Sequence, residues 1–519
     1  MNPTFDFRGH LRNVVPRFLL MDFRGPEWQL SHDQVVGVCV AGFFFLVWFF
    51  WEFYDDRRYN VPKGSLGWIP FFGETLEFAR NPRDYTARRF KKYGPVFKGC
   101  FLGLRAVVSM DPEFSQLRDV NGAECFKITL PRNLRAMIGD TYNMSAEQAG
   151  LQKVLLGVMQ PETLKSQIKE IEALILAGLS QWEGKTIGVW RSCKKIVLSI
   201  SVYVNLGHDP SEKKIRDQIS KLVPIFNEAL VAPPLYLPGT LYYRGYQARL
   251  KMESLLGQMV KRRRQSWSEN ILLTSKDLLS ALLRYKTTEG KELSLKQITD
   301  VICISFLGGQ DTSTAALSCT IKELSKSALI RKAVVAECDA IEERRFASTS
   351  LTMADTRNML YIKKLFKEVL RKHTIVPFTQ RQAKEDVDIN GSLIPRGWYA
   401  IAMLSSINMN PKLWTNPEVF NPSRFDEPQQ AKVFAPFGVG AHMCPAKALA
   451  ELISSIFVYH LLHKYEWKVE GKLVDEKLKT GALLPIPVPK EEIRLLVRRR
   501  KMIAKKQMTP PSTFVPTHR

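Results

Sequence analysis

The sequence predicts a mainly α-helical, enzyme-sized body that follows a single apolar segment. Helical periodicity of apolar residues dominates the chain after about residue 113, and residues 248–267 and 294–324 form the clearest long helices. Strand signals are few. Residues 94–113 predict two short strands around Leu102 and Gly103, and residues 386–397 carry an Asn-Gly hairpin signal at Asn390. We therefore expect a large α-rich body with a small β-sheet region.

Composition limits the class of protein further. The chain has 519 residues, of which 45% are hydrophobic and 24% charged, so disorder, collagen-like repeats and a multi-span transporter are poor fits. Lysine and arginine total 75 against 51 acidic residues, a net charge of +24 that favours nucleic acid, an anionic membrane surface or an acidic protein partner. Because no recognition motif for nucleic acid occurs, we expect no nucleic-acid partner. The eight cysteines form no C-x-x-C pair, which indicates a reducing compartment.

Residues 34–54 predict one transmembrane anchor. The run 35–51 contains no charged residue, and tryptophans gather at its end as interfacial aromatic residues do. A buried core helix is the alternative. An N-terminal tail, residues 1–33, precedes the run, so it is not a standard signal peptide, and Arg8, Arg12 and Arg17 leave organelle targeting open.

The rest of the chain divides into three parts. Residues 55–73 place prolines around glycines, a composition that predicts a stiff, non-helical hinge. Residues 74–500 are expected to form the globular body. Residues 501–519 are basic and then proline-rich, which predicts a disordered tail.

The most informative segment is residues 434–455, where a glycine-containing loop leads through Cys444 to an apolar helix. The start of a helix lowers the pKa of a thiol, so we expect a thiolate at Cys444 that could bind iron. Gly440 would let the loop backbone approach a flat cofactor, and Phe437 could shield the sulfur from water. Taken alone, a buried structural thiol is the simpler interpretation.

Residues 304–317 form a helix in which Gly308 and Gly309 precede Asp311 and Thr312. Each glycine costs a helix about 1 kcal/mol, which suggests that the space beside them is used. An acid and an alcohol facing that space could relay protons to a ligand. The alternative is helix packing with a hydrogen bond from Thr312 to the backbone.

Three charged residues complete the pattern. Glu368 and Arg371 lie three positions apart on one helix face, where a bidentate pair can form. Such a pair is common on protein surfaces. Arg424 lies in a proline-punctuated loop upstream of Cys444 and could join it.

Together and in this order, these features resemble the cytochrome P450 family of membrane-bound haem-thiolate monooxygenases, from the anchor to about residue 498. The resemblance implies the cytochrome P450 fold, haem b with Cys444 as axial iron ligand, and Phe437 and Gly440 in its loop. It implies that Asp311 and Thr312 activate O2 and that Glu368, Arg371 and Arg424 form a structural triad. Electrons would come from NADPH through a flavoprotein reductase.

Several positions depart from the family pattern. His442 stands where an arginine that binds a haem propionate is usual, and Gln148 and Gln152 stand where an aromatic residue or histidine and an arginine are expected. Arg381 matches another propionate-binding position, and Lys153 is a candidate substitute. We therefore expect haem to bind, though less tightly.

Within the family, the segments 62–78, 235–251 and 375–398 look most like the plant clan that oxidises terpenoids, sterols and related hormones. This resemblance implies a hydrophobic substrate and an endoplasmic reticulum membrane protein with a cytosolic catalytic domain; the plastid envelope is the minority expectation. We expect a substrate pocket that is lined by apolar residues and by a glycine of the helix at 304–317, where the missing side chain leaves space. These are Ile375, Val376, Pro377, Phe378 and Gly308.

Two other functions stay open. The chain could be a haem-thiolate isomerase or dehydratase that uses no reductase electrons, or a degenerate, non-catalytic binding protein on this fold. Asp311 and Thr312 argue against the first, and Gln148 and Gln152 motivate the second. The sequence does not identify the skeleton or carbon oxidised, the number of successive oxidations or the oligomeric state.

Overall fold

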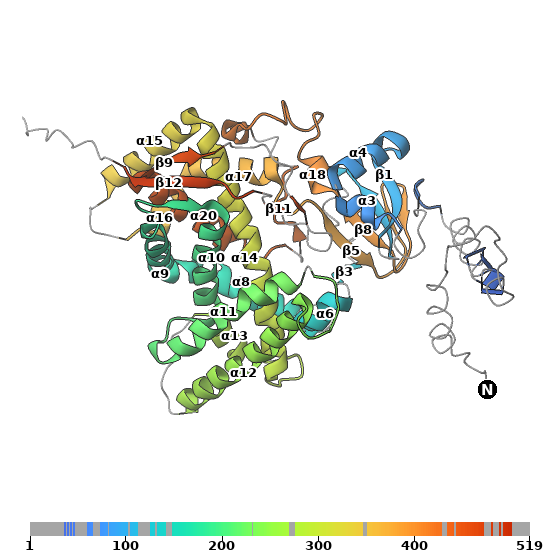
Figure 1. The fold of residues 1–519 in the computed structure, drawn as a ribbon, viewed down its shortest axis with the longest axis horizontal. Helices are drawn as coiled ribbons and strands as arrows, with labels where there is room; N and C mark the ends of the chain where they lie inside the picture. Colours follow the sequence, from blue (N-terminus) through green and yellow to red (C-terminus); the bar gives the residue numbers. More distant parts are fainter. Residues whose placement is uncertain are drawn as a thin grey trace, which may run out of the picture.

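The structure is a computed structural model, and it describes the greater part of the chain. The described ranges are 36–37, 39–40, 42–43, 45–46, 60–65, 73–80, 82–101, 104–112, 125–129, 132–141, 148–230, 232–268, 276–345, 350–427, 433–440, 443–471, 479–480, 487–488 and 491–500. Helices dominate these ranges, and a small sheet lies to one side of the helical body (Figure 1). The predicted α-rich body with few strands is confirmed.

The helical body is arranged around α14 (Leu295–Lys326), which runs through its middle (Figure 1). Ser294 begins α14 with a capping box that it shares with Gln297, and α10, α12 and α17 pack against its buried faces. The long helices expected at 294–324 and 248–267 are confirmed as α14 and α12. The other helices of the body are α6 (Arg132–Ile138), α8 (Gln148–Met159), α9 (Pro161–Ser180), α10 (Val189–Leu206), α11 (Lys213–Ala229), α12 (Leu241–Ser268), α13 (Leu278–Arg284), α15 (Ala328–Arg344), α16 (Met353–Asn358), α17 (Leu360–His373) and α20 (Lys447–Lys464).

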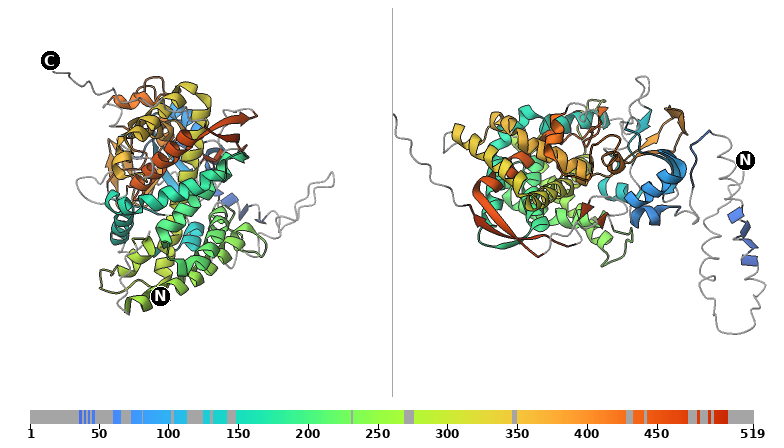
Figure 2. Two further views of the ribbon diagram at one scale, coloured as in Figure 1. Left: turned by 90° about the vertical axis from the view of Figure 1, so that its left-hand side faces the viewer. Right: turned by 90° about the horizontal axis from the view of Figure 1, so that it is seen from above.

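A five-stranded sheet in the order β1-β2-β8-β5-β3 forms the second part of the body. Its strands are β1 (Val96–Phe101), β2 (Leu104–Ser109), β3 (Phe126–Lys127), β5 (Thr379–Ala383) and β8 (Tyr399–Ala402), and β2 and β8 are parallel whereas the other pairs are antiparallel. α3 (Thr75–Arg80), α4 (Pro82–Tyr93) and α18 (Leu404–Ile407) lie beside it (Figure 1). The blue helices α3 and α4 are seen beside the sheet again in the right-hand view of Figure 2. β5 matters for function because it begins directly after the predicted substrate-pocket residues.

Both local strand predictions are confirmed. β1 and β2 form the hairpin expected in 94–113. β6 (Val387–Ile389) and β7 (Ser392–Ile394) form the second hairpin, in which Asn390 and Gly391 have φ of 53° and 76°, as a tight two-residue turn requires. A three-stranded sheet, β4-β12-β9, joins β4 (Thr186–Gly188) to β9 (Tyr465–Glu470) and β12 (Arg494–Arg499), and β10 (Lys479–Thr480) pairs with β11 (Pro487–Val488).

Part of the hinge predicted at 55–73 is described, and it is docked on the sheet. Residues 60–65 contain no helix, and the Lys98 N–H donates to the Lys63 carbonyl at 3.2 Å. At the other end, Gly73 forms a β-bridge with Phe101, and directly after the hinge the Glu74 N–H donates to the Cys100 carbonyl at 2.8 Å. The connector is therefore held along β1 at two points.

The termini lie mostly beyond these ranges. Within the described part of the chain, no helix is sufficiently long and apolar to cross a bilayer. Most of the anchor predicted at 34–54, and all of the tails predicted at 1–33 and 501–519, lie outside the described residues.

Candidate active site

Residues 433–440 and 443–446, here named the cysteine loop, lead from the body to the start of α20. Gly438 and Gly440 have φ of 73° and 70°, a conformation that residues with side chains rarely adopt. The Cys444 N–H donates to the Phe437 carbonyl at 2.8 Å, and the Met443 N–H donates to the Gly440 carbonyl at 3.1 Å. These bonds fold the loop back on itself and place the thiol just before α20.

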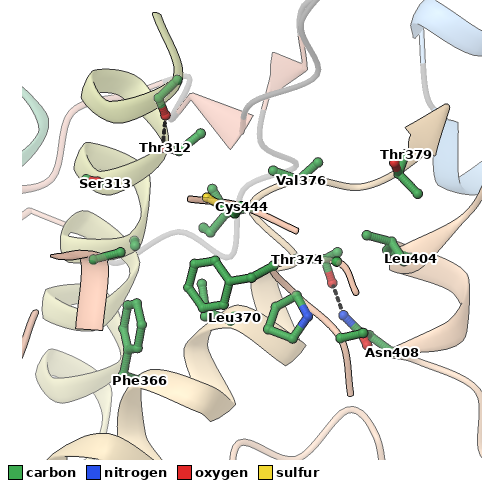
Figure 3. A pocket seen from close by; sticks show the side chains of 18 of the residues that line it. Thr312, Ser313, Phe366, Leu370, Thr374, Val376, Thr379, Leu404, Asn408 and Cys444 are labelled. Atoms are coloured by element: carbon green, nitrogen blue, oxygen red, sulfur yellow. Dashed lines mark hydrogen bonds between the residues drawn. The ribbon is translucent and has the colours of Figure 1, made fainter. Parts of the chain in front are cut away.

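Cys444 lines two cavities of about 320 and 250 Å³. The cavities share part of their walls, namely Gly308, Thr312, Ser313, Phe437, Cys444 and Ala450. Figure 3 shows Cys444 between α14, which carries Thr312, and the segment that carries Val376. The structure therefore brings the cysteine loop and the glycine-containing part of α14 together, although they are more than a hundred residues apart in the sequence.

The electrostatic surroundings of Cys444 correct one expectation. Burial raises the pKa of the Cys444 thiol, and a hydrogen bond from the Ala446 N–H lowers it by less. We expected the helix start to lower this pKa. The opposite holds because apolar surroundings disfavour the charged thiolate, and a helix terminus acts only within its first turn.

Thr312 faces both cavities and also bonds its own helix. Its Oγ1 donates to the Gly308 carbonyl at 2.6 Å, which is the backbone bond considered as the alternative. A Cβ placed on Gly308 or Gly309 would meet no atom within 4 Å. The glycines therefore border open space, and a rotation of the Thr312 hydroxyl would present it there.

Asp311 lies differently from its neighbour. It lines neither cavity, and its Oδ1 is 3.1 Å from Lys194 Nζ on α10. The two side chains are 23% and 21% exposed, so the ion pair is partly shielded from water. Lys194 was not predicted as a site residue, because nothing near it in the sequence indicates that α10 packs against this turn of α14.

Glu368, Arg371 and Arg424 form one buried network. Arg371 donates from Nε and Nη2 to the two oxygens of Glu368, both at 2.8 Å, and Arg424 Nε donates to Glu368 Oε1 at 3.0 Å. Glu368 and Arg371 are 0% exposed, so this is not the surface pair considered as the alternative. Arg371 also donates to the Asn408 and Pro417 carbonyls, which ties α17 to the segment that leads to the cysteine loop.

The candidate propionate contacts do not all lie together. Arg381 lines the larger cavity and donates from Nη1 to Thr379 Oγ1 at 3.1 Å and to the Gln380 carbonyl at 2.8 Å. Lys153 is exposed on α8 and lines neither cavity. His442 lies outside the described residues. Gln152 Nε2 donates to the Met443 carbonyl at 2.9 Å, so this side chain contacts the cysteine loop.

The predicted substrate pocket is present in part. Gly308, Ile375 and Val376 line the larger cavity, whereas Pro377 and Phe378 do not. Phe378 instead packs on Phe78 beside the sheet, with ring centroids 5.3 Å apart. From Thr379 the chain runs as β5, in which successive side chains point to opposite faces. Thr379 and Arg381 line the cavity, and Phe378, one residue before Thr379, is directed to the other face.

Sequence reasoning missed several wall residues. Thr374 ends α17 in a left-handed conformation with φ of 40°, and Asn408 Nδ2 donates to its Oγ1 at 3.1 Å (Figure 3). The position of Thr374 directly after the Glu368–Arg371 helix could have identified it. Phe366, Leu370 and Leu404 give no such signal, because they look like ordinary core residues in the sequence.

The residues around Cys444 fit a haem group. A haem that is bound through a thiolate needs a sulfur that faces a slot, space on either side for the flat macrocycle, and a cation at the edge for its carboxylates. The thiol borders both cavities, the glycines of α14 leave the adjoining space open, and the guanidinium of Arg381 lies in the wall of the larger one.

Comparisons with known proteins agree with this site. The family described as "Cytochrome P450" matches residues 189–494. The abscisic acid 8'-hydroxylase 4 of Arabidopsis thaliana is 32% identical over 453 residues, which cover 86% of this chain and 94% of the relative. The abscisic acid 8'-hydroxylase 3 of Oryza sativa subsp. indica is 30% identical over 441 residues, 84% and 86% of the two chains.

A solved structure shares the fold. Retinoic acid-bound cyanobacterial CYP120A1 has a TM-score of 0.74 at 25% sequence identity, over 85% of this chain and 99% of that one. A fold of this kind with a cysteine facing such a slot defines a haem-thiolate protein. The chain belongs to the cytochrome P450 family and is a P450 monooxygenase.

Proposed function

We propose that this protein is an NADPH-reductase-dependent monooxygenase that hydroxylates or otherwise oxidises a hydrophobic terpenoid or sterol-like substrate with O2. The observation that carries the proposal is that Cys444 and Thr312 line the same cavity, whose remaining wall includes the apolar Leu370, Ile375 and Val376. One oxygen atom enters a C–H bond of the substrate. The other leaves as water, with two electrons and two protons consumed.

Haem, when bound, supplies the iron at which O2 is reductively activated. Cys444 is the residue that would bind this iron, and the bond from its own N–H to the Phe437 carbonyl holds it in the loop. Arg381 is the proposed partner of a propionate. Phe437 lines both cavities beside the thiol and would exclude water from the sulfur.

Asp311 and Thr312 are the proposed proton-handling pair. Thr312 holds its hydroxyl proton on the Gly308 carbonyl and can turn it into the open space beside that glycine. Asp311, oriented by Lys194, is the proposed source that replenishes this proton. The buried triad of Glu368, Arg371 and Arg424 contacts neither cavity in this scheme and acts by holding the segment before the cysteine loop.

The substrate class rests on the wall and on the relatives. The cavity wall is mostly apolar but includes a few hydroxyls and amides, such as those of Thr374 and Asn408. Such a wall suits a mostly apolar ring system that carries a small number of polar groups. The two plant relatives are named for a hydroxylation of abscisic acid. We extend only the class, a terpenoid-derived skeleton, to this protein.

The location and the electron donor are also proposals. The uncharged run 35–51 supports a single-pass anchor within 34–54, which would place the catalytic body 74–500 on the cytosolic face of the endoplasmic reticulum. A flavoprotein reductase at the same membrane would pass electrons from NADPH. A lipid-soluble substrate is consistent with this placement.

The test is a reduced carbon monoxide difference spectrum followed by turnover with a terpenoid panel in the presence of reductase, NADPH and ¹⁸O2. We expect a thiolate-type absorbance maximum, its loss in Cys444→Ala and Cys444→His, and one labelled oxygen in the product. Retained turnover in either variant would contradict the haem-thiolate site. Product formed without NADPH would identify an isomerase or dehydratase, and absence of haem uptake would identify a binding protein.

A further inference from the structure

The peptide unit between Met443 and Cys444 is held at both of its ends. On the nitrogen side, the Cys444 N–H donates to the Phe437 carbonyl at 2.8 Å, within the cysteine loop. On the carbonyl side, the Met443 oxygen accepts a hydrogen bond from Gln152 Nε2 at 2.9 Å. The second bond joins residues 291 positions apart and comes from a different element, α8.

The described part of the loop has further restraints of its own. Gly438 and Gly440 allow backbone conformations that residues with side chains rarely adopt, and the Met443 N–H makes a 3.1 Å bond back to Gly440. These bonds lie within the loop and preserve its shape, whereas Phe434 and Phe437 pack against the core and hold the first part of the loop on the body. The bond from Gln152 fixes the loop to a helix whose Leu151 and Leu155 are buried in the main core.

The Cys444 thiol depends on this peptide for its direction. Rotation about the bonds that flank the Met443–Cys444 peptide would swing Cβ of Cys444 and carry the sulfur out of the slot that it borders. The hydrogen bond from Gln152 to the Met443 carbonyl opposes that rotation. It restrains the carbonyl side of the peptide, whereas the bond to Phe437 restrains the nitrogen side.

From this geometry we infer that Gln152 is a positioning residue for the thiol. It holds the peptide before Cys444 so that the sulfur stays directed into the slot. The inference rests on the proposed function in so far as the slot holds haem. It also assigns a purpose to a residue that departs from the family pattern, because a neutral amide donor serves a carbonyl, whereas a propionate would be served better by a cation.

Gln152→Leu and Gln152→Glu are the test variants, since neither can donate to the Met443 carbonyl. The matched control is Gln148→Leu, one turn earlier on α8, for which the structure gives no bond to the loop. In the holoenzyme, we measure how fast the thiolate-type carbon monoxide spectrum converts to the form that lacks the thiolate. Loss of one neutral hydrogen bond should accelerate this conversion roughly 2- to 10-fold in both test variants and leave the control unchanged.

A second readout needs no haem. Hydrogen exchange of peptides that contain Cys444, measured on protein prepared without haem, should be faster in both test variants than in wild type and in Gln148→Leu. Test variants that match wild type in both measurements would overturn the inference. A loss of haem affinity in Gln152→Glu alone, with normal exchange in Gln152→Leu, would instead assign Gln152 to a propionate.

The proposed function fails separately. A wild-type protein without any thiolate-type spectrum would overturn the haem-thiolate proposal, and the exchange measurement would still decide whether Gln152 holds the loop. A wild-type spectrum of the expected kind, together with unchanged behaviour of both test variants, would retain the proposed function and remove Gln152 from it.

Discussion

Lys194 Nζ lies 3.1 Å from Asp311 Oδ1, where α10 packs on α14. The next residue along α14, Thr312, faces the two cavities, and Asp311 does not. The two members of the proposed proton-handling pair therefore point in different directions, and the orientation of the carboxylate depends on a lysine from another helix.

We expect Lys194→Met to slow product formation about three- to tenfold while haem content and thermal stability stay near wild type. The stability effect is small because a partly exposed ion pair contributes about 1 kcal/mol or less, whereas proton delivery depends on the orientation of Asp311. The measurement is kcat against pH, with Lys195→Met, the exposed neighbour on α10, as the control. Equal rates in both variants would show that Lys194 does not orient the acid.

Thr312→Ala should keep haem binding but direct more of the consumed electrons to hydrogen peroxide. The substitution removes a hydroxyl that faces both cavities, so proton delivery into the cavities would become less selective. The measurement is the ratio of product to NADPH consumed, with peroxide assayed in parallel. Thr314→Ala is a close control, because Thr314 makes the same kind of backbone bond, 2.7 Å to the Gln310 carbonyl, and lines neither cavity. Unchanged coupling in Thr312→Ala would leave its hydroxyl with a helix-packing role only.

Arg371→Ala should lower the free energy of unfolding by about 3–5 kcal/mol, since it leaves the fully buried Glu368 carboxylate without its bidentate partner. Denaturant unfolding followed by circular dichroism measures the change. Lys372→Ala, which loses an ion pair to the largely exposed Glu418, should cost about 1 kcal/mol or less. Comparable losses in the two variants would contradict the burial of the network.

His373 predicts a stability change at alkaline pH. Its Nε2 lies 2.9 Å from Glu323 Oε1, with Lys326 Nζ 3.9 Å from the same oxygen. Burial lowers the pKa of His373, but the neighbouring Cys319 and Glu323 raise it by more, so that this pKa rises from 6.5 to about 9. A raised folded-state pKa means that the stabilisation is complete below pH 6.5 and is lost as pH rises through about 9.

The unfolding free energy should therefore fall by about 2–3 kcal/mol between neutral pH and pH values well above 9. Denaturant titrations across this range measure it. His373→Gln should flatten the profile, and His208→Gln, at an exposed histidine, should leave it as in wild type. A wild-type profile without this fall would show that His373 is neutral in the folded state.

The net charge of +24 predicts that reduction by an acidic-faced reductase slows as ionic strength rises. Salt screens exposed charges over about 8–10 Å at ionic strengths near 0.1–0.15 M, which weakens steering. Stopped-flow reduction rates from low to high salt measure the effect. Lys447→Gln, exposed beside Cys444 at the start of α20, should flatten the profile more than Lys261→Gln on α12. If the wild-type reduction rate did not change with salt, the positive net charge would have no part in the encounter with the reductase.

Much of the architecture is encoded locally. The apolar periodicity of α12 and α14 and the Asn390–Gly391 turn each depend on residues close together in the sequence, and each appears as predicted. The same holds for the chemistry that Cys444 suggests, because the glycine-containing loop, Cys444 and the following apolar helix lie within about twenty residues. Local patterns of this kind are visible in a single sequence because short-range backbone preferences produce them.

The sequence by itself thus determined the helical class, the cysteine loop and the residue types of the site. Only the tertiary structure decided that Asp311 turns to Lys194, that Gln152 reaches Met443, and that Phe378 leaves the pocket for Phe78. It also decided the direction of the Cys444 pKa. The physical reason is common to all four: each depends on which groups from distant segments surround a side chain, and packing between helices and sheet sets those surroundings.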